Sequence, residues 1–246
     1  MNAYASRTAA VLSLVVAMTL VTSTLADPLP GRDLLKFSQL PMDNTPIGPV
    51  PSIPYWGHDE LSTAYAAMTG TPAAAYRGTF MADDFADKIS APIVHVKWWG
   101  SYLNNFQNPQ IPVTKFLVAF EADQPAIPGT FSYPTPPIHS QIVTLGALSP
   151  GSGTYTENLI SPGGQPLNEH LYEYNAELAV PFDQKADTVY WLKIVALVDV
   201  PPTIDPTDPN APVPRWGWHN RDYTIQNTTA SPLVSPGEQQ MGSING

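Results

Sequence analysis

The apolar stretch TVYWLKIVALVDV, residues 188–200, determines the fold that we predict for this chain. Its apolar side chains occupy odd and even positions alike, so both faces of a strand formed here would be apolar. Such a strand is typical of the centre of a sheet that is covered on both sides. We therefore expect residues 188–200 to form a central, buried strand.

Four further segments have the pattern of strands, and clusters rich in Gly and Pro separate them. They are residues 93–99, 116–121, 140–148 and 171–178. No alternation of strand and helix units occurs along the chain. Strands of this length with turns between them predict an all-β fold, an antiparallel β-sandwich.

Proline makes up 28 of the 246 residues, which favours turns and sheet edges over long helices. Its close spacing between residues 27 and 54 predicts an extended leader. The one helix that we expect covers residues 59–68, an alanine-rich stretch followed by Gly70. Residues 228–246 are rich in Ser, Gly and Pro, and we expect this tail to be flexible.

The N-terminus has the pattern of a secretory signal peptide. Arg7 precedes an apolar stretch, and Thr24 and Ala26 are small residues at the positions before a cleavage site. The apolar stretch is shorter than the roughly 20 residues that a membrane span needs. We therefore expect a secreted protein without membrane insertion. The predicted parts are a signal peptide (1–26), a proline-rich leader with the short helix (27–78), a β-sandwich (79–227) and a flexible tail (228–246).

Composition excludes several classes of function. The chain has 11 basic and 21 acidic residues, a net charge of −10, which disfavours nucleic-acid partners and anionic membrane surfaces. Cysteine is absent, which excludes disulfides, thiolate metal sites and cysteine nucleophiles. The sequence also lacks the metalloprotease, nucleophile-elbow, phosphate-loop and dinucleotide motifs. No catalytic residue is assigned on this basis.

Several short motifs follow one another in a fixed order. They are ADDF (82–85), VKWWGSY (96–102), residues 116–123 with Pro125 and PG (128–129), YWL (190–192) and WGW (216–218). In this order they resemble a family of bacterial secreted domains of uncharacterised function. The resemblance implies a jelly-roll-like β-sandwich in an extracellular or cell-surface setting, and it supplies no catalytic residues. Members often carry a surface-sorting C-terminal segment. Because no apolar segment and basic tail precede Gly246, we expect a released protein.

Tryptophan supplies the candidate binding residues. Trp98 and Trp99 are neighbours, so in a strand one would face the core and the other would face outward. Trp216 and Trp218 are two residues apart and would share a face. Flat aromatic rings beside polar groups stack against sugars, and large aromatics also fill the cores of β-sandwiches. Trp99, Trp216 and Trp218 are therefore candidates for a ligand-binding platform, with core packing as the alternative.

One loop has the composition of a metal site. Asp205, Asp208 and Asn210 present three oxygen ligands at close spacing, which suits Ca²⁺. The alternative is an acidic turn whose side chains satisfy the local backbone. A structural Ca²⁺ is the one cofactor that we consider.

Asp83 and Asp84 form a second acidic cluster, just before Phe85. Neighbours in a strand face opposite sides, which does not suit a paired acid and base. They are candidates for a catalytic acid or a calcium ligand, or they accept hydrogen bonds from nearby backbone amides.

Three functions fit these observations. The first is a secreted non-enzymatic module that binds a glycan, a matrix polymer or a surface protein outside the cell. The second is a secreted polysaccharide hydrolase, which would need two carboxylates about 5–9.5 Å apart across a cleft. The third is a structural component of an extracellular matrix. The absence of a recognised catalytic motif favours the first function.

Overall fold

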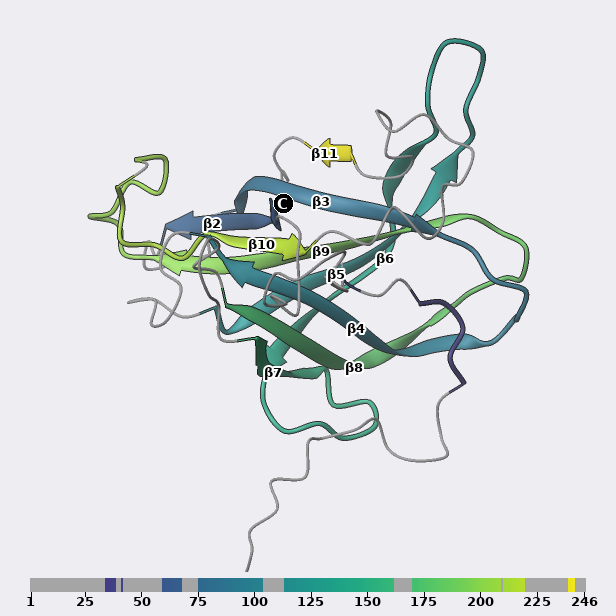
Figure 1. Ribbon diagram of the computed structural model, residues 1–246, viewed down its shortest axis with the longest axis horizontal. Helices are drawn as coiled ribbons and strands as arrows, with labels where there is room; N and C mark the ends of the chain where they lie inside the picture. Colours follow the sequence, from purple (N-terminus) through teal and green to yellow (C-terminus); the bar gives the residue numbers. More distant parts are fainter. Residues whose placement is uncertain are drawn as a thin grey trace, which may run out of the picture.

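The computed structural model describes residues 34–38, 41, 59–67, 75–103, 113–161, 170–208, 210–219 and 239–241. Within these residues the chain forms eleven strands and no helix (Figure 1). The predicted signal peptide and most of the predicted tail lie outside the described residues. The strands are β1 (Asp59–Leu61), β2 (Thr63–Ala67), β3 (Arg77–Phe85), β4 (Pro92–Tyr102), β5 (Lys115–Gln124), β6 (Tyr133–Leu145), β7 (Thr154–Ser161), β8 (Leu171–Asp183), β9 (Tyr190–Val200), β10 (Trp216–His219) and β11 (Gln239–Met241).

All eleven strands belong to one sheet, in the order β1-β10-β4-β8-β7-β6-β5-β9-β2-β3-β11. The sheet is mixed, because β2 runs parallel to β9 and β6 runs parallel to β7. It curls until β1 and β3 are in contact, which makes it nearly barrel-shaped (Figure 1). The prediction of an all-β fold is confirmed. The predicted sheets are antiparallel throughout, which the two parallel pairings contradict, and the division into a sandwich or jelly roll is not confirmed.

Ser62 joins the two sides of the sheet. It lies between β1, which pairs with β10, and β2, which pairs with β3 and β9. Its amide donates to Trp216 O at 3.0 Å, and its carbonyl accepts from Ala196 N at 2.9 Å. Its hydroxyl donates to Ile194 O and accepts from Met81 N at 3.1 Å. One fully buried residue therefore holds strands from both ends of the sheet order together.

The helix predicted at residues 59–68 is wrong, because this stretch forms β1 and β2. Alanine has the highest helix propensity, but helix propensity is a weak preference that tertiary pairing overrides. Thr63 donates its hydroxyl to Trp216 O at 2.7 Å and accepts from Trp216 N at 2.8 Å. A Cβ on Gly78 would lie 2.0 Å from Thr63 O, so the backbones of β2 and β3 are in close contact. The small side chains Ala64 and Ala66 suit this close packing, and both are buried.

The predicted central strand is confirmed as β9. Its neighbours Ile194 and Val195 point to opposite faces of the sheet, and both are fully buried. Ile194 belongs to the large aromatic core inside the curled sheet. Val195 packs with Phe80 and Leu197 on the outer face. Both faces of β9 are therefore covered.

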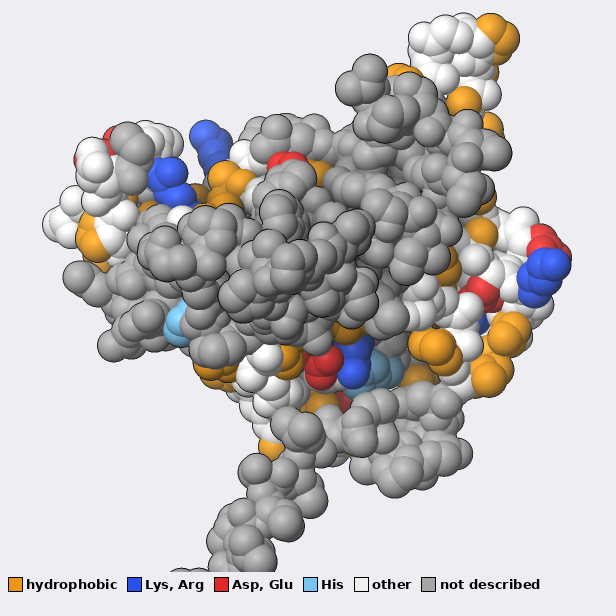
Figure 2. Space-filling model, viewed as in Figure 1, with side chains coloured by type: hydrophobic (Ala, Val, Ile, Leu, Met, Phe, Trp, Pro, Cys, Tyr) orange, Lys and Arg blue, Asp and Glu red, His pale blue; other side chains and the backbone are white. Residues whose placement is uncertain are grey.

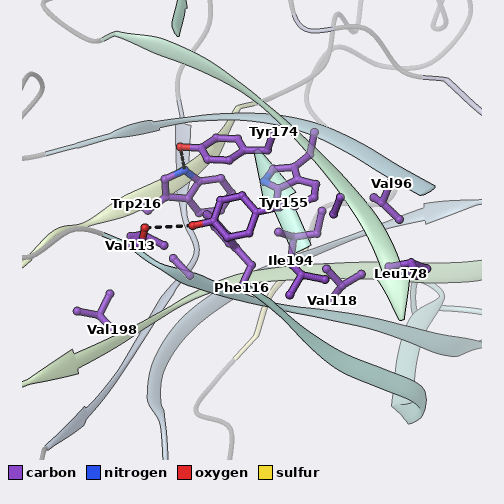
Figure 3. Close-up of a cluster of buried hydrophobic side chains, with 14 of the residues drawn as sticks. Val96, Val113, Phe116, Val118, Tyr155, Tyr174, Leu178, Ile194, Val198 and Trp216 are labelled. Carbon is purple, nitrogen blue, oxygen red and sulfur yellow. Dashed lines mark hydrogen bonds between the residues drawn. The ribbon is translucent and has the colours of Figure 1, made fainter. Parts of the chain in front are cut away.

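Aromatic side chains fill the inside of the sheet (Figure 3). Trp98 stacks on Tyr174 with ring centroids 5.4 Å apart and planes at 6°. Trp216 donates its Nε1–H to the Tyr174 hydroxyl at 3.0 Å, and Tyr155 donates its hydroxyl to Val113 O at 3.0 Å. These three polar groups are hydrogen-bonded inside the core, so their burial carries no penalty for an unpaired atom.

Part of the predicted leader packs against the sheet. The ring of Phe37 lies 5.8 Å from that of Phe85 in β3. Lys36 Nζ donates to Ile89 O at 2.8 Å and to Ala91 O. The same nitrogen lies 3.7 Å from Asp87 Oδ2. Strands β1 and β2 also fall within the stretch 27–78, and β11 falls within 228–246. In the described residues no helix is long and apolar enough to cross a membrane.

Candidate functional site

The outer face of β4, β8 and β7 carries an ordered set of polar side chains around one tryptophan. Antiparallel pairing places them in three cross-strand rows. We call this set the polar face. It comprises the rows Trp99–Glu173–Asn158, Lys97–Asn175–Thr156 and His95–Glu177.

Ion pairs and hydrogen bonds connect the strands of the polar face. Glu173 Oε1 accepts from Asn175 Nδ2 at 3.0 Å and lies 3.3 Å from Lys97 Nζ. His95 Nδ1 lies 3.3 Å from Glu177 Oε1. The side chains of Lys97 and Glu173 are 34% and 24% exposed, whereas that of Glu177 is 2% exposed. The face therefore runs from a solvent-accessible end beside Trp99 to a buried end at Glu177.

Several buried polar atoms of this face are unpaired within the described part of the chain. They are Asn175 Oδ1, Thr156 Oγ1 and His95 Nε2. A buried polar atom without a hydrogen bond costs about 1–3 kcal/mol, so such atoms are usually paired in native proteins. All three atoms are inaccessible at the surface, so they belong to the buried part of the polar face.

Figure 2 shows acidic, basic and histidine side chains gathered side by side over β4 and β8, below the centre of the view. Trp99 extends this group toward the end of β4, where its cross-strand partner is Glu173. A half-buried indole beside carboxylate, amide and ammonium groups combines a flat apolar surface with donors and acceptors.

The three candidate tryptophans lie in different environments. Trp99 is half-buried on the outer face, and its neighbour Trp98 is the core residue. Trp216 is fully buried, with its nitrogen on Tyr174. Trp218 is partly buried and packs against the same core. Trp216 and Trp218 face the inside of the sheet, so the structure does not bring them together with Trp99.

The candidate metal loop satisfies its own backbone. Asp205 Oδ1 accepts from Thr207 N at 2.9 Å and from Thr207 Oγ1 at 2.7 Å. These hydrogen bonds lower the pKa of Asp205. Asp208 Oδ1 accepts from Asn210 N at 2.9 Å. In the described residues no group of three or more His, Asp or Glu side chains could hold a metal ion.

The carboxylates considered for catalysis are not brought together as a pair. Asp83 is aligned with Leu192 and Asp84 with Trp191, so the two side chains point to opposite faces of β3. Asp83 Oδ1 accepts from Asp84 N at 3.0 Å, which is the backbone role considered above. Within the polar face, Glu173 and Glu177 lie four residues apart on one strand. Their Cα atoms are therefore about 13 Å apart.

A half-buried carboxylate, that of Glu157, lies behind the polar face, inside the sheet. Glu157 in β7 accepts from the Tyr102 hydroxyl at 3.0 Å. Burial raises the pKa of Glu157, and hydrogen bonds from Tyr174 and Tyr102 oppose that rise. Burial raises the pKa of Tyr102 as well, with the charge of Glu157 as the next cause. Both tyrosines are therefore protonated donors at neutral pH.

The sequence reasoning missed every residue of the polar face except Trp99. The signal is present, because His95, Lys97 and Trp99 alternate with core residues in β4. Glu173, Asn175 and Glu177 do the same in β8. Two-residue periodicity places each set on one face, but which strands pair cannot be read from it.

Comparison with known protein families identifies the family of this chain. Residues 35–242 match the model of a family described as a domain of unknown function, DUF7901. The chain belongs to this family. Its membership agrees with the resemblance to an uncharacterised family. The DUF7901 match begins within the predicted leader and includes all eleven strands. No curated protein and no solved structure matches the chain.

Proposed function

We propose that this chain is an exported, non-enzymatic module that binds a polysaccharide through the polar face of β4, β7 and β8. The observation that carries the proposal is the half-buried indole of Trp99 beside the partly exposed side chains of Lys97 and Glu173. A sugar ring offers both chemistries that this face requires. Its C–H face packs on an indole, and its hydroxyl groups donate and accept hydrogen bonds.

Three residues at the accessible end of the polar face have a role in this proposal. Trp99 is the stacking surface for one sugar ring. Glu173 pairs with the hydroxyls of that ring, and Lys97 holds Glu173 in place through the ion pair between Lys97 Nζ and Glu173 Oε1 at 3.3 Å.

A binding role fits this geometry better than the hydrolase alternative. Glycosidases place two carboxyl groups about 5–9.5 Å apart, on either side of the scissile bond. Glu173 and Glu177 start from Cα atoms about 13 Å apart on one strand. Asn175 lies between them on the same face. The two carboxylates are thus spaced along one strand and do not face each other from two separate elements.

The experiment is affinity electrophoresis of the purified protein through gels that contain soluble neutral polysaccharides, namely xylan, glucan and mannan. The proposal predicts retardation by at least one polymer, with no new reducing ends after prolonged incubation. New reducing ends would establish the hydrolase instead. Unchanged mobility in every gel, together with self-association in sedimentation, would favour the structural role.

A further inference from the structure

A pocket of about 660 Å³ lies beside β2 and the start of β3, against the loop that precedes β10. Its volume is in the range of pockets that hold small molecules. Leu61, Tyr65 and Pro206 contribute apolar walls, and Thr79 and Thr207 contribute hydroxyl groups. None of these residues belongs to the polar face, so this pocket is a separate site.

Two arginines, Arg77 and Arg215, line this pocket. They are the only arginines in the described part of the chain. Arg77 comes from β3 and is exposed, while Arg215 directly precedes β10 and is half-buried. Figure 2 shows basic side chains at this end of the molecule. Two guanidinium groups therefore line one pocket of a protein that has a net charge of −10.

The wall that carries Arg215 is fixed by hydrogen bonds. Arg215 Nη2 donates to Asp208 O at 3.1 Å, which ties the arginine to its own loop. Tyr65 donates its hydroxyl to Pro214 O at 2.9 Å, which ties that loop to β2. Burial raises the pKa of Tyr65 to about 12, so this hydroxyl remains a donor at neutral pH. The position of the Arg215 backbone is therefore set before a ligand binds.

We propose that this pocket binds the carboxylate of an acidic saccharide between Arg77 and Arg215. Guanidinium groups form paired hydrogen bonds with carboxylates, which a neutral or cationic group cannot accept in the same way. The threonine hydroxyls and the apolar walls match the hydroxyls and the C–H face of a sugar ring. A phosphate or sulfate ester lacks the planar geometry of a carboxylate but shares its charge, so it serves as a competitor in the test.

Three acidic residues near the pocket have partners within the protein. Asp205 accepts two hydrogen bonds from Thr207, and Asp208 accepts from Asn210. Asp199 forms an ion pair with Lys115, in which Lys115 Nζ lies 2.7 Å from Asp199 Oδ2. Of these three carboxylates only Asp199 is paired with a cation, while Asp205 and Asp208 keep their charges because Thr207 and Asn210 are neutral donors.

The test uses isothermal titration of the purified protein with short uronate oligomers, namely oligogalacturonate, oligomannuronate and oligoglucuronate. The proposal predicts binding of at least one oligomer, which weakens as salt rises because charge is involved. The Arg77→Gln variant is expected to weaken binding at least tenfold. The exposed residue Lys185 gives the matched control, since Lys185→Gln removes the same charge elsewhere.

Four results would overturn the proposal. One is the absence of binding to all three oligomers at millimolar concentration. The second is unchanged affinity in Arg77→Gln, which tests the pocket even if Arg215→Gln fails to fold. The third is equal affinity for the methyl-esterified oligomer, which has no charge. The fourth is tighter binding of inorganic sulfate or phosphate than of the uronate, which would point to a general oxyanion site. A protein that fails to bind neutral polysaccharides would contradict only the proposal for the polar face. The uronate titration tests the arginine pocket independently of that result.

Discussion

Trp216 donates its indole Nε1–H to the hydroxyl of Tyr174 at 3.0 Å, and both side chains are fully buried. The Phe116 ring lies 4.9 Å from that of Trp216, so the indole is surrounded on its apolar side as well. Trp216 therefore stabilises the closed end of the sheet, where β10 pairs with both β1 and β4.

Replacing Trp216 by Phe should destabilise the fold. The change removes a buried hydrogen bond and leaves a cavity, which together cost about 2–4 kcal/mol. In a domain of this size 1 kcal/mol corresponds to a Tm change of about 2–4 °C. We expect a clear fall in Tm by calorimetry. A Trp216→Phe protein that melts like the wild type would show that the indole is not a core residue.

Ser62→Ala tests how the sheet is closed. The variant keeps the backbone hydrogen bonds to Trp216 and Ala196 but removes the hydroxyl that accepts from Met81 N. A buried amide left unpaired costs about 1–3 kcal/mol. The control is Ser140→Ala on the exposed face of β6, which should change stability by less than about 0.5 kcal/mol. Equal stability of the two variants in urea unfolding would contradict this account of closure.

Glu157→Gln tests the half-buried carboxylate through pH. Because burial raises the pKa of Glu157 above its ordinary value of 4.5, the folded state binds more protons than the unfolded state above that pH. The contribution of Glu157 to stability is then lost as pH rises through this window. Glu157→Gln cannot ionise, so its Tm relative to wild type should rise between pH 4 and pH 7. Asp183→Asn, on an exposed residue, is the matched control. A difference that stays constant with pH would contradict the raised pKa.

The calcium prediction for residues 205–210 has a direct test. A Ca²⁺ ion bound only by the folded protein would raise Tm by mass action. The prediction requires a higher Tm in Ca²⁺ than in EDTA, and loss of that difference in Asp208→Asn. The same Tm in both solutions would contradict the calcium prediction. The role of Asp205 and Asp208 would then be to accept hydrogen bonds from the backbone amides of Thr207 and Asn210.

The strands were predictable because their apolar residues recur at two-residue intervals. Strand β9 covers residues 190–200 of the predicted stretch 188–200, and Tyr174 and Leu178 in β8 face the core as their alternation indicates. The alanine-rich stretch 59–67 was not predictable as strand, because its conformation depends on Ser62 and Thr63 contacting partners more than 100 residues away. Propensity describes the local chain and contains no information on such partners.

The candidate site was predictable only in part, for a related reason. Trp99 could be recognised as one of two neighbouring indoles, one inside and one outside. The polar face around it depends on register, since Trp99 meets Glu173 only because β4 and β8 pair as they do. The arginine pocket depends on topology too. Arg77 and Arg215 are 138 residues apart in the sequence, and they line the same pocket only because the fold places both beside β2.

The central claim, that the polar face binds a polysaccharide, is tested most directly by Trp99→Ala. Phe131→Ala is the matched control. Phe131 is an aromatic residue that is 65% exposed, and it lies in the connection between β5 and β6, outside the polar face. Affinity for the retarding polysaccharide is measured by titration, with Tm as the check on folding. The account predicts at least tenfold weaker binding by Trp99→Ala, unchanged binding by Phe131→Ala and a Tm close to wild type for both. Full affinity in a folded Trp99→Ala protein would contradict it.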